Sequence, residues 1–322
     1  MRFKRWVAAA MVATMGLAAS GCGGSDGGSN GGSGLEKTDI KIGVLPLADY
    51  AAVYWADQKG FFKKEGLNVT LQPIQGGPVG VQKVVSNELE VSFSNSISSS
   101  IASDKGAPIK TIAITSSLGP GTNTIFVKPD SPIKDINGLD GKTIGVNTVN
   151  NIGDVTFKNL ATSMGLNVKP KWVEVPFPEM INGVKSGSIQ AGYLPEPFAT
   201  AARKERLRPV VDLTNGPNRA LPAATFVIST MFAKTSPRTT EAVQRAINAA
   251  SKDMSSKEAE FRAWIPSVSN TSKEAAEVMR LPIFESENSV EKLQRVADTL
   301  IRLGLVKKGY RASEYTFVPG KG

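Results

Sequence analysis

The segment at residues 40–67, IKIGVLPLADYAAVYWADQKGFFKKEGL, predicts a strand, a loop and a helix in succession. Apolar side chains alternate along residues 40–44, which is the two-residue period of a β-strand. Pro46 ends this pattern, a helix rich in Ala and aromatic residues is expected over 51–62, and Gly66 stands where a helix C-terminal glycine is typical. In open α/β sheets, ligands bind in the loops that follow the strands. This loop is therefore the first candidate for a binding site.

Strands and helices alternate in the sequence that follows. Strands are expected at residues 69–72, 90–93 and 109–115, with helices at 81–87 and 97–105. Such alternation predicts a parallel sheet. The Gly and Pro residues of the SSLGPG segment at 116–121 then indicate a hinge or crossover.

The same pattern starts again after Thr122. Residues 42–44 (IGV) recur as residues 144–146, and residues 84–93 (VVSNELEVSF) align with residues 184–193 (VKSGSIQAGY), each about 100 residues later. Two such pairs at nearly one spacing predict two similarly built α/β lobes. Coincidence among common strand patterns is the alternative.

The C-terminal third is expected to be mostly helical. A strand at residues 225–229 would carry the chain back to the first lobe. Apolar residues at helical spacing then indicate helices at 241–254, 256–264, 272–279 and 289–303. We expect these helices to pack on the first lobe and complete it.

The N-terminus indicates export. Arg2, Lys4 and Arg5 precede an uncharged run, which ends in Ala-Ser-Gly and Cys22. The run is shorter than the roughly 20 residues of a membrane-spanning helix, so residues 1–21 are expected to be a cleaved lipoprotein signal peptide. Cys22 is the expected lipidation site, and residues 22–37 the lipid anchor and Gly/Ser tether. The alternative is an ordinary secretory signal followed by an incidental free thiol.

Composition excludes several classes of site. Histidine is absent and Cys22 is the only cysteine of the 322 residues, which removes the common metal ligands, the usual general base and any intramolecular disulfide. The formal net charge is +9, but Lys and Arg are scattered, so no nucleic-acid partner is expected. We expect no metal and no cofactor.

Three motifs carry a family resemblance. The segment GFFKKEGL at residues 60–67, GLDGK at 138–142 and EPF at 196–198, together with the export signal, resemble the solute-binding proteins of ABC transporters. The nitrate/sulfonate/taurine and thiamine-precursor group is the one they resemble. The resemblance covers nearly all of the chain from about Thr38 onward.

This resemblance implies an α/β, type II periplasmic-binding-protein fold with two α/β lobes, a hinge and two crossovers. Lobe one would comprise residues 38–120 and 226–322, and lobe two residues 121–225. The protein would be a monomer, lipid-anchored on the extracytoplasmic face of the cell membrane, and would deliver a small molecule to an ABC permease. A sensor lipoprotein with the same binding chemistry is an alternative. A pyrimidine-precursor synthase of the same fold depends on His and a Cys-rich motif, which this sequence lacks, so no enzymatic activity is expected.

Candidate ligand-binding residues lie in the loops that follow the strands of both lobes. They are Asp49, Tyr50, Gly77, Asn95, Ser96, Ser117, Asn147, Asn150, Asn151, Phe177 and Glu196. Several stand where a helix begins, so backbone N–H groups and Ser or Asn side chains could bind a polar ligand. For Ser96, helix capping alone is the alternative.

The charge of these loops indicates the charge of the ligand. Asp49 and Glu196 are their only carboxylates, and no basic residue stands beside them in these loops. Because a buried, unpaired carboxylate is costly, we expect it to face an ammonium or ring N–H rather than nitrate. A taurine-like zwitterion or an aminopyrimidine fits this expectation. Alternatively, Asp49 starts a helix and Glu196 holds its loop. Phe177, between two prolines, is expected to lie in a loop and contact the ligand rather than the core.

Overall fold

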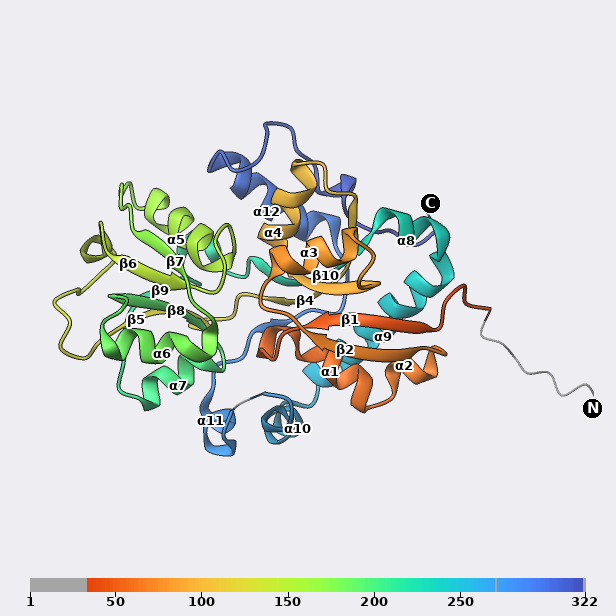
Figure 1. Cartoon of the computed structure of the whole chain (residues 1–322), viewed down its shortest axis with the longest axis horizontal. Coiled ribbons are helices and arrows are strands. Elements are labelled where there is room, and N and C mark those ends of the chain that lie inside the picture. The colour runs from red at the N-terminus through yellow and green to blue at the C-terminus, as the bar shows by residue number, and fades with distance from the viewer. Residues whose placement is uncertain (1–33, 270, 321–322) are drawn as a thin grey trace, which may run out of the picture. The chain divides into compact units, whose positions relative to one another are not determined.

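Two β-sheets organise the residues that the computed structural model describes, which are 34–269 and 271–320 (Figure 1). The expected signal peptide, Cys22 and most of the tether lie outside these residues. Among the described residues, we find no helix with the length and apolar character needed to cross a membrane.

The first sheet has six strands in the order β11-β4-β10-β3-β1-β2. Its strands are β1 (Asp39–Val44), β2 (Asn68–Pro73), β3 (Val91–Asn95), β4 (Ile109–Ser117), β10 (Pro222–Ser229) and β11 (Ile283–Phe284). β1 pairs in parallel with β2 and β3, as predicted. The prediction of a wholly parallel sheet is wrong, because β10 returns from the second sheet and runs antiparallel to both β3 and β4.

The second sheet repeats this arrangement with five strands in the order β7-β6-β8-β5-β9. Its strands are β5 (Asn123–Val127), β6 (Thr143–Val146), β7 (Lys171–Glu174), β8 (Ala191–Pro195) and β9 (Arg208–Asp212). β6 lies between two parallel neighbours, as β1 does, and β5 runs antiparallel to β8 and β9. The chain passes between the sheets twice, from β4 to β5 and from β9 to β10.

Helices cover both faces of each sheet (Figure 1). Those around the first sheet are α1 (Ala51–Gln58), α2 (Phe61–Lys64), α3 (Gly77–Val85), α4 (Ser96–Asp104), α8 (Thr230–Thr235), α9 (Pro237–Ser255), α10 (Glu258–Trp264) and α12 (Val290–Arg302). α11 (Lys273–Val278) packs on α10 and on a helix of the second sheet. Those around the second are α5 (Ile152–Ser163), α6 (Phe177–Ser186) and α7 (Phe198–Lys204). α9 packs against α1, α2 and β4, and α12 packs against α4, as expected of the C-terminal helices.

The helix expected over residues 51–62 is interrupted. Gly60 has φ +75°, in the left-handed region that favours glycine, and it separates α1 from α2. Trp55 of α1 is fully buried, and its Nε1–H donates a hydrogen bond to Asp253 Oδ2 of α9 at 2.9 Å. α1 is therefore fixed to the C-terminal helices, and this places the loop before it.

Candidate ligand-binding site

A cavity of about 30 Å³ lies where the two sheets meet. Elements of the first sheet contribute Leu45, Leu47, Asp49, Tyr50, Gly77, Phe93, Asn95, Ala223 and Ala224 to its lining. Those of the second sheet contribute Asn123, Asn147, Asn151, Ile152, Phe177, Tyr193 and Pro195. Of the predicted residues, the structure thus brings together Asp49, Tyr50, Gly77, Asn95, Asn147, Asn151 and Phe177.

Asp49 is held at the end of β1 by two hydroxyl groups of β4. It lies in a single 3-10 turn, Ala48–Tyr50, and is only 7% exposed. Ser116 Oγ donates to its carboxylate Oδ1 at 2.9 Å, and Thr115 Oγ1 donates to its backbone carbonyl at 2.9 Å. Burial raises the pKa of the Asp49 carboxyl to about 6; the Ser116 bond opposes this rise, and the negative charge of Glu196 adds to it.

Asn95 and Asn151 join the two halves of the site. Asn95 ends β3 and caps α4, since its side-chain oxygen accepts from the Ser98 backbone N–H at 2.9 Å. Asn151 caps α5 in a capping box with Asp154. Asn95 Nδ2 donates to Asn151 Oδ1 at 2.6 Å. Each asparagine therefore fixes a helix start and the other asparagine.

Two further hydrogen bonds join the two halves of the site. Asn147 Nδ2 donates to the Gln75 carbonyl at 3.3 Å, and Ser98 Oγ donates to the Asn150 carbonyl at 3.2 Å. The Asn150 side chain is exposed and does not line the cavity. Asn150 thus contributes its backbone to this contact.

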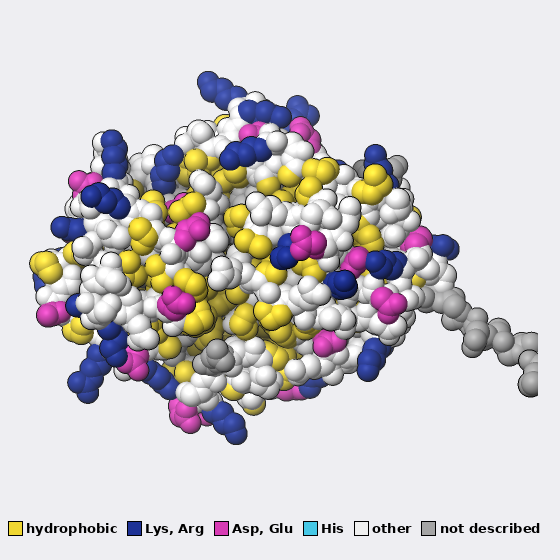
Figure 2. Space-filling model, in the orientation of Figure 1, with side chains coloured by type: hydrophobic (Ala, Val, Ile, Leu, Met, Phe, Trp, Pro, Cys, Tyr) yellow, Lys and Arg dark blue, Asp and Glu magenta, His cyan; other side chains and the backbone are white. Residues whose placement is uncertain are grey.

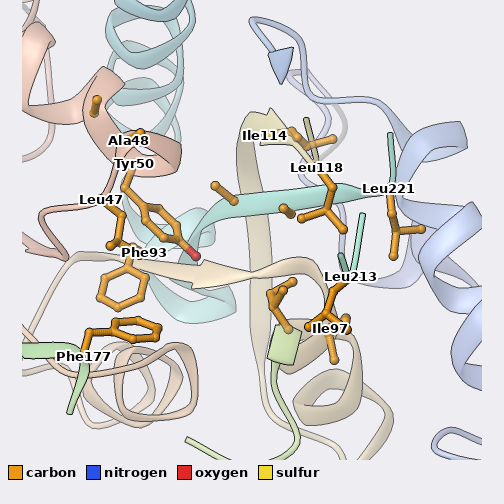
Figure 3. Packing of buried hydrophobic residues seen from close by; sticks show 14 of the residues in the cluster. Leu47, Ala48, Tyr50, Phe93, Ile97, Ile114, Leu118, Phe177, Leu213 and Leu221 are labelled. Carbon is orange, nitrogen blue, oxygen red and sulfur yellow. The ribbon is translucent and has the colours of Figure 1, made fainter. Parts of the chain in front are cut away.

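Aromatic rings form one wall of the cavity. Tyr50 packs on Phe93 with ring centroids 4.8 Å apart, and Phe177 stacks on Phe198 at 5.6 Å. Figure 3 shows the Phe177 ring directed towards Phe93, Leu47 and Tyr50. These packed rings leave the polar side chains of the lining little freedom to move away from the cavity.

Comparison with known proteins identifies the family. The model of the family described as NMT1/THI5 like matches residues 48–260. This chain belongs to the NMT1/THI5-like family. The match includes every predicted ligand-binding residue. The expected resemblance is therefore confirmed at the level of the family.

The NMT1/THI5-like chain shares its fold with solved solute-binding proteins. The periplasmic aliphatic sulphonate binding protein SsuA from Escherichia coli has a TM-score of 0.68 at 14% identity, covering 87% of this chain and 98% of that one. The alkanesulfonate-binding protein SsuA from Xanthomonas axonopodis pv. citri, bound to MOPS, has a TM-score of 0.71 at 16% identity, covering 88% of this chain and 99% of that one. The periplasmic nitrate-binding protein NrtA from Synechocystis PCC 6803 has a TM-score of 0.68 at 14% identity, covering 85% of this chain and 84% of that one. The expected periplasmic-binding-protein fold is confirmed.

One relative, the protein NrtC, is similar to this chain over part of its length. The nitrate import ATP-binding protein NrtC from Synechocystis sp. (strain ATCC 27184 / PCC 6803 / Kazusa) is 24% identical over 208 residues, which are 58% of this chain and 31% of NrtC. The NMT1/THI5-like chain thus spans about a third of that protein.

Two predicted serines lie outside the cavity lining of this NMT1/THI5-like protein. Ser96 Oγ donates to the Pro222 carbonyl at 2.5 Å. Ser117 Oγ donates to Glu285 Oε1 at 2.7 Å. Ser96 thus joins the start of α4 to β10, and Ser117 joins β4 to the residue that follows β11.

Glu196 also lies outside the lining. Its side chain is 1% exposed, Oε1 accepts from Arg203 Nη1 at 2.9 Å, and Oε2 accepts from the Thr200 N–H at 3.0 Å. The prediction that no basic residue accompanies this carboxylate is wrong, because α7 begins just after it and brings Arg203 back within two turns. Burial raises the pKa of Glu196, and Thr200 and Arg203 oppose that rise.

The prediction that Phe177 lies in a loop outside the core is wrong as well. Phe177 is the first residue of α6, is 5% exposed, and belongs to the hydrophobic core. Proline is well suited to the first turn of a helix, so Pro176 and Pro178 start α6 here and the ring turns inward. It nevertheless lines the cavity, and it packs on Tyr193 at 5.9 Å.

Asn123 and Tyr193 were missed by the sequence analysis. The Tyr193 hydroxyl donates to Asn123 Oδ1, and both side chains line the cavity. The rule that ligands bind after strands overlooks Asn123, which begins β5. Because β5 runs antiparallel to β8, its first residue lies opposite Pro195 at the end of β8. Ala223 and Ala224 near the start of β10 reach the site in the same way.

One charged side chain, Asp49, is found among the described residues that line the cavity. The other polar groups there are the amides of Asn95, Asn123, Asn147 and Asn151 and two tyrosine hydroxyls. Within the described part of the chain, no cluster of carboxylates could hold a metal ion. The cavity can thus accept hydrogen bonds through Asp49 and compensate a positive charge.

Proposed function

We propose that this protein is the solute-binding component of an ABC import system and that it captures a small organic molecule bearing an amino group. Its family, and a fold shared with proteins named for sulphonate and nitrate binding, support the binding role. A cavity lined from two α/β sheets supports the location of the ligand.

The buried carboxylate of Asp49 is the reason to expect a solute with an amino group. A bare anion such as nitrate would bring a second negative charge close to Asp49, with no Lys or Arg among the described residues of the lining. An ammonium or amino group instead donates hydrogen bonds to the Asp49 carboxylate. An aminopyrimidine or a taurine-like zwitterion presents such a group.

The remaining parts of the proposal concern delivery. Lobe one, residues 38–120 and 226–322, and lobe two, residues 121–225, would close on the solute by rotating about the two crossovers. The closed monomer would then deliver it to a membrane permease. Lipidation at Cys22 would keep the protein at the extracytoplasmic face of the membrane.

A thermal-shift panel tests this function. The mature protein is mixed with 4-aminopyrimidines, taurine, alkanesulfonates and nitrate, and a compound that binds the native state raises Tm with its concentration. We expect an amino compound to do so and Asp49→Asn to remove the shift. Asp130→Asn, at an exposed site, is the matched control and should retain it. A shift by nitrate with none by any amino compound would contradict the proposal.

A further inference from the structure

A groove of about 260 Å³ adjoins the cavity at Asp49. Its lining residues are Leu45, Pro46, Pro73, Ile74, Gln75, Asn147, Pro176, Phe177, Pro178 and Phe198. Leu45, Asn147 and Phe177 line both spaces, so the groove lies next to the cavity. On the face drawn in Figure 2, hydrophobic side chains gather in the hollow between the parts of the molecule that carry α6 and β2.

The two spaces differ in size in a way that constrains the solute. The cavity has a volume of about 30 Å³. A cavity needs about 10–15 Å³ to hold one water molecule, so this one has room for about two atoms of that size. An amino group and its carbon fill a cavity of this size. Any larger solute that reaches Asp49 must therefore extend beyond the cavity, and the groove that shares its walls is the adjoining space.

The two spaces also differ in chemistry. The groove is lined by four prolines, two phenylalanines, Leu45 and Ile74, and no charged side chain is found among the described residues of its lining. Of its two polar residues, Asn147 donates its side-chain N–H to the Gln75 carbonyl. An apolar group that enters the groove is removed from water, and no ion pair has to be broken to admit it. Both effects favour its binding.

The groove walls are held in place before any solute arrives. The Phe177 and Phe198 rings stack at 5.6 Å with an angle of 27° between their planes. Proline fixes the backbone φ angle, so the walls at residues 73 and 176–178 have few alternative shapes. A preformed apolar surface binds an apolar group with little loss of conformational entropy.

We propose that the solute carries an apolar substituent, which this groove binds while the amino group reaches Asp49. The substrate class is thus an amine, or an amino-substituted ring, with an aliphatic or aromatic extension. This inference rests on the proposed function, because it requires an amino group in the cavity.

A series of primary amines tests it on the full chain without its signal peptide. Ethylamine, butylamine and hexylamine are titrated by isothermal calorimetry. We expect Kd to fall by about fourfold for each added methylene, as for transfer of a methylene from water to an apolar site. Ethylamine, the shortest amine of the series, enters the groove least, and the dependence on chain length reports on the groove.

Gln75→Trp supplies a variant that fills the groove, and Gln82→Trp supplies its control. Gln75 is exposed and lines the groove, whereas Gln82 is exposed on α3 away from it. We expect Gln75→Trp to abolish the gain in affinity from ethylamine to hexylamine and Gln82→Trp to retain it. Circular dichroism checks that both variants are folded.

The possible failures are distinguishable. If neither these amines nor any amino compound of the thermal-shift panel binds, both the proposed function and this inference are wrong. If an amino compound of that panel binds and none of the three amines does, this inference alone is overturned. If ethylamine binds and hexylamine binds no more tightly, the inference alone is overturned. Equal loss of the chain-length dependence in the two tryptophan variants also overturns it, because the apolar group would then lie elsewhere.

Discussion

The side-chain amide of Asn95 donates a hydrogen bond of 2.6 Å to the side-chain oxygen of Asn151. Asn95 ends β3 of the first sheet, and Asn151 caps α5 beside the second. Both side chains are buried and both line the cavity. This bond between two helix caps thus connects the two halves of the cavity, beside the bonds that Asn147 and Ser98 donate across the same site.

The substitution Asn95→Asp tests this connection. The new carboxylate would keep an oxygen to accept from the Ser98 N–H, but it has no donor for Asn151. We expect a loss of about 1–3 kcal/mol in the free energy of unfolding, because two acceptors would face each other in a buried site. Urea denaturation measures it. Asn151→Asp is the matched control, since it can still accept from Asn95, and the Thr148 hydroxyl, which accepts from Asn151 Nδ2, can donate to the new carboxylate instead. An equal loss in both variants would contradict this account.

Asp49→Asn should stabilise the protein without solute while weakening solute binding. Burial raises the pKa of Asp49 to about 6 from the ordinary 3.8, so ionisation opposes folding at neutral pH. Removing it should gain up to about 3 kcal/mol at pH 7. The contribution of the Asp49 carboxyl to the stability of the wild type is fully present below pH 3.8, and it is lost as the pH rises through about 6 and the buried carboxyl ionises. The gain should therefore disappear near pH 3.8, and urea titrations from pH 3.5 to 8 test this. An unchanged gain at both ends would contradict it.

Solute affinity should depend on pH in the opposite direction. An amino group that carries a positive charge binds the ionised Asp49 carboxylate, whose pKa is about 6 in the absence of solute. We expect Kd to be flat from pH 7 to 8 and to rise by up to tenfold per unit below about pH 6. Calorimetric titrations at several pH values measure this. Asp49→Asn should show weak, pH-independent binding; a wild-type Kd that stays constant down to pH 5 would show that Asp49 does not contact the solute.

Phe177→Ala should destabilise the fold as well as alter the site. The ring is 5% exposed and packs on both Tyr193 and Phe198. Removing it leaves a cavity, for which the expected cost is about 3–5 kcal/mol. Phe61→Ala, at a half-buried ring on α2, should cost less. Thermal and urea unfolding compare the two, and an equal cost would show that Phe177 lies outside the core.

Glu196→Gln should affect stability more than solute affinity. The variant loses the charge that pairs with Arg203, at an expected cost of about 2 kcal/mol. Because Glu196 does not line the cavity, Kd for the solute should change by less than about threefold, which is a change of about RT in the free energy of binding. The double variant Glu196→Gln/Arg203→Met should recover part of the stability. A tenfold loss of affinity with stability unchanged would instead make Glu196 a solute contact.

Local patterns in the sequence were sufficient for much of the architecture. The two-residue alternation of apolar side chains predicts β1, and the recurrence of IGV predicts that β6 has the same surroundings. Both strands do lie between two parallel neighbours. Such patterns succeed because alternation and helical spacing depend on which face of an element is buried, and burial of apolar area dominates folding.

The same patterns fail where distant segments meet. Glu196 reads as an unpaired carboxylate until α7 brings Arg203 to it, and Phe177 reads as a loop residue until α6 turns the ring into the core. Asn123 carries no signal in the sequence, because only the antiparallel pairing of β5 with β8 places the start of a strand at the cavity.

By itself, the sequence determined the alternating strands and helices, the internal repeat, the family and the position of Asp49 in the loop after the first strand. The strands, the helices and the position of Asp49 follow from residue spacing along one segment. The repeat follows from comparing two segments of the sequence, and the family from its resemblance to known proteins. The tertiary structure alone decided that Asp49 is buried beside Ser116, that Asn95 bonds Asn151, and that an apolar groove lies next to the cavity. Those features depend on strand order and strand direction, which bring together side chains that lie dozens of residues apart in the chain.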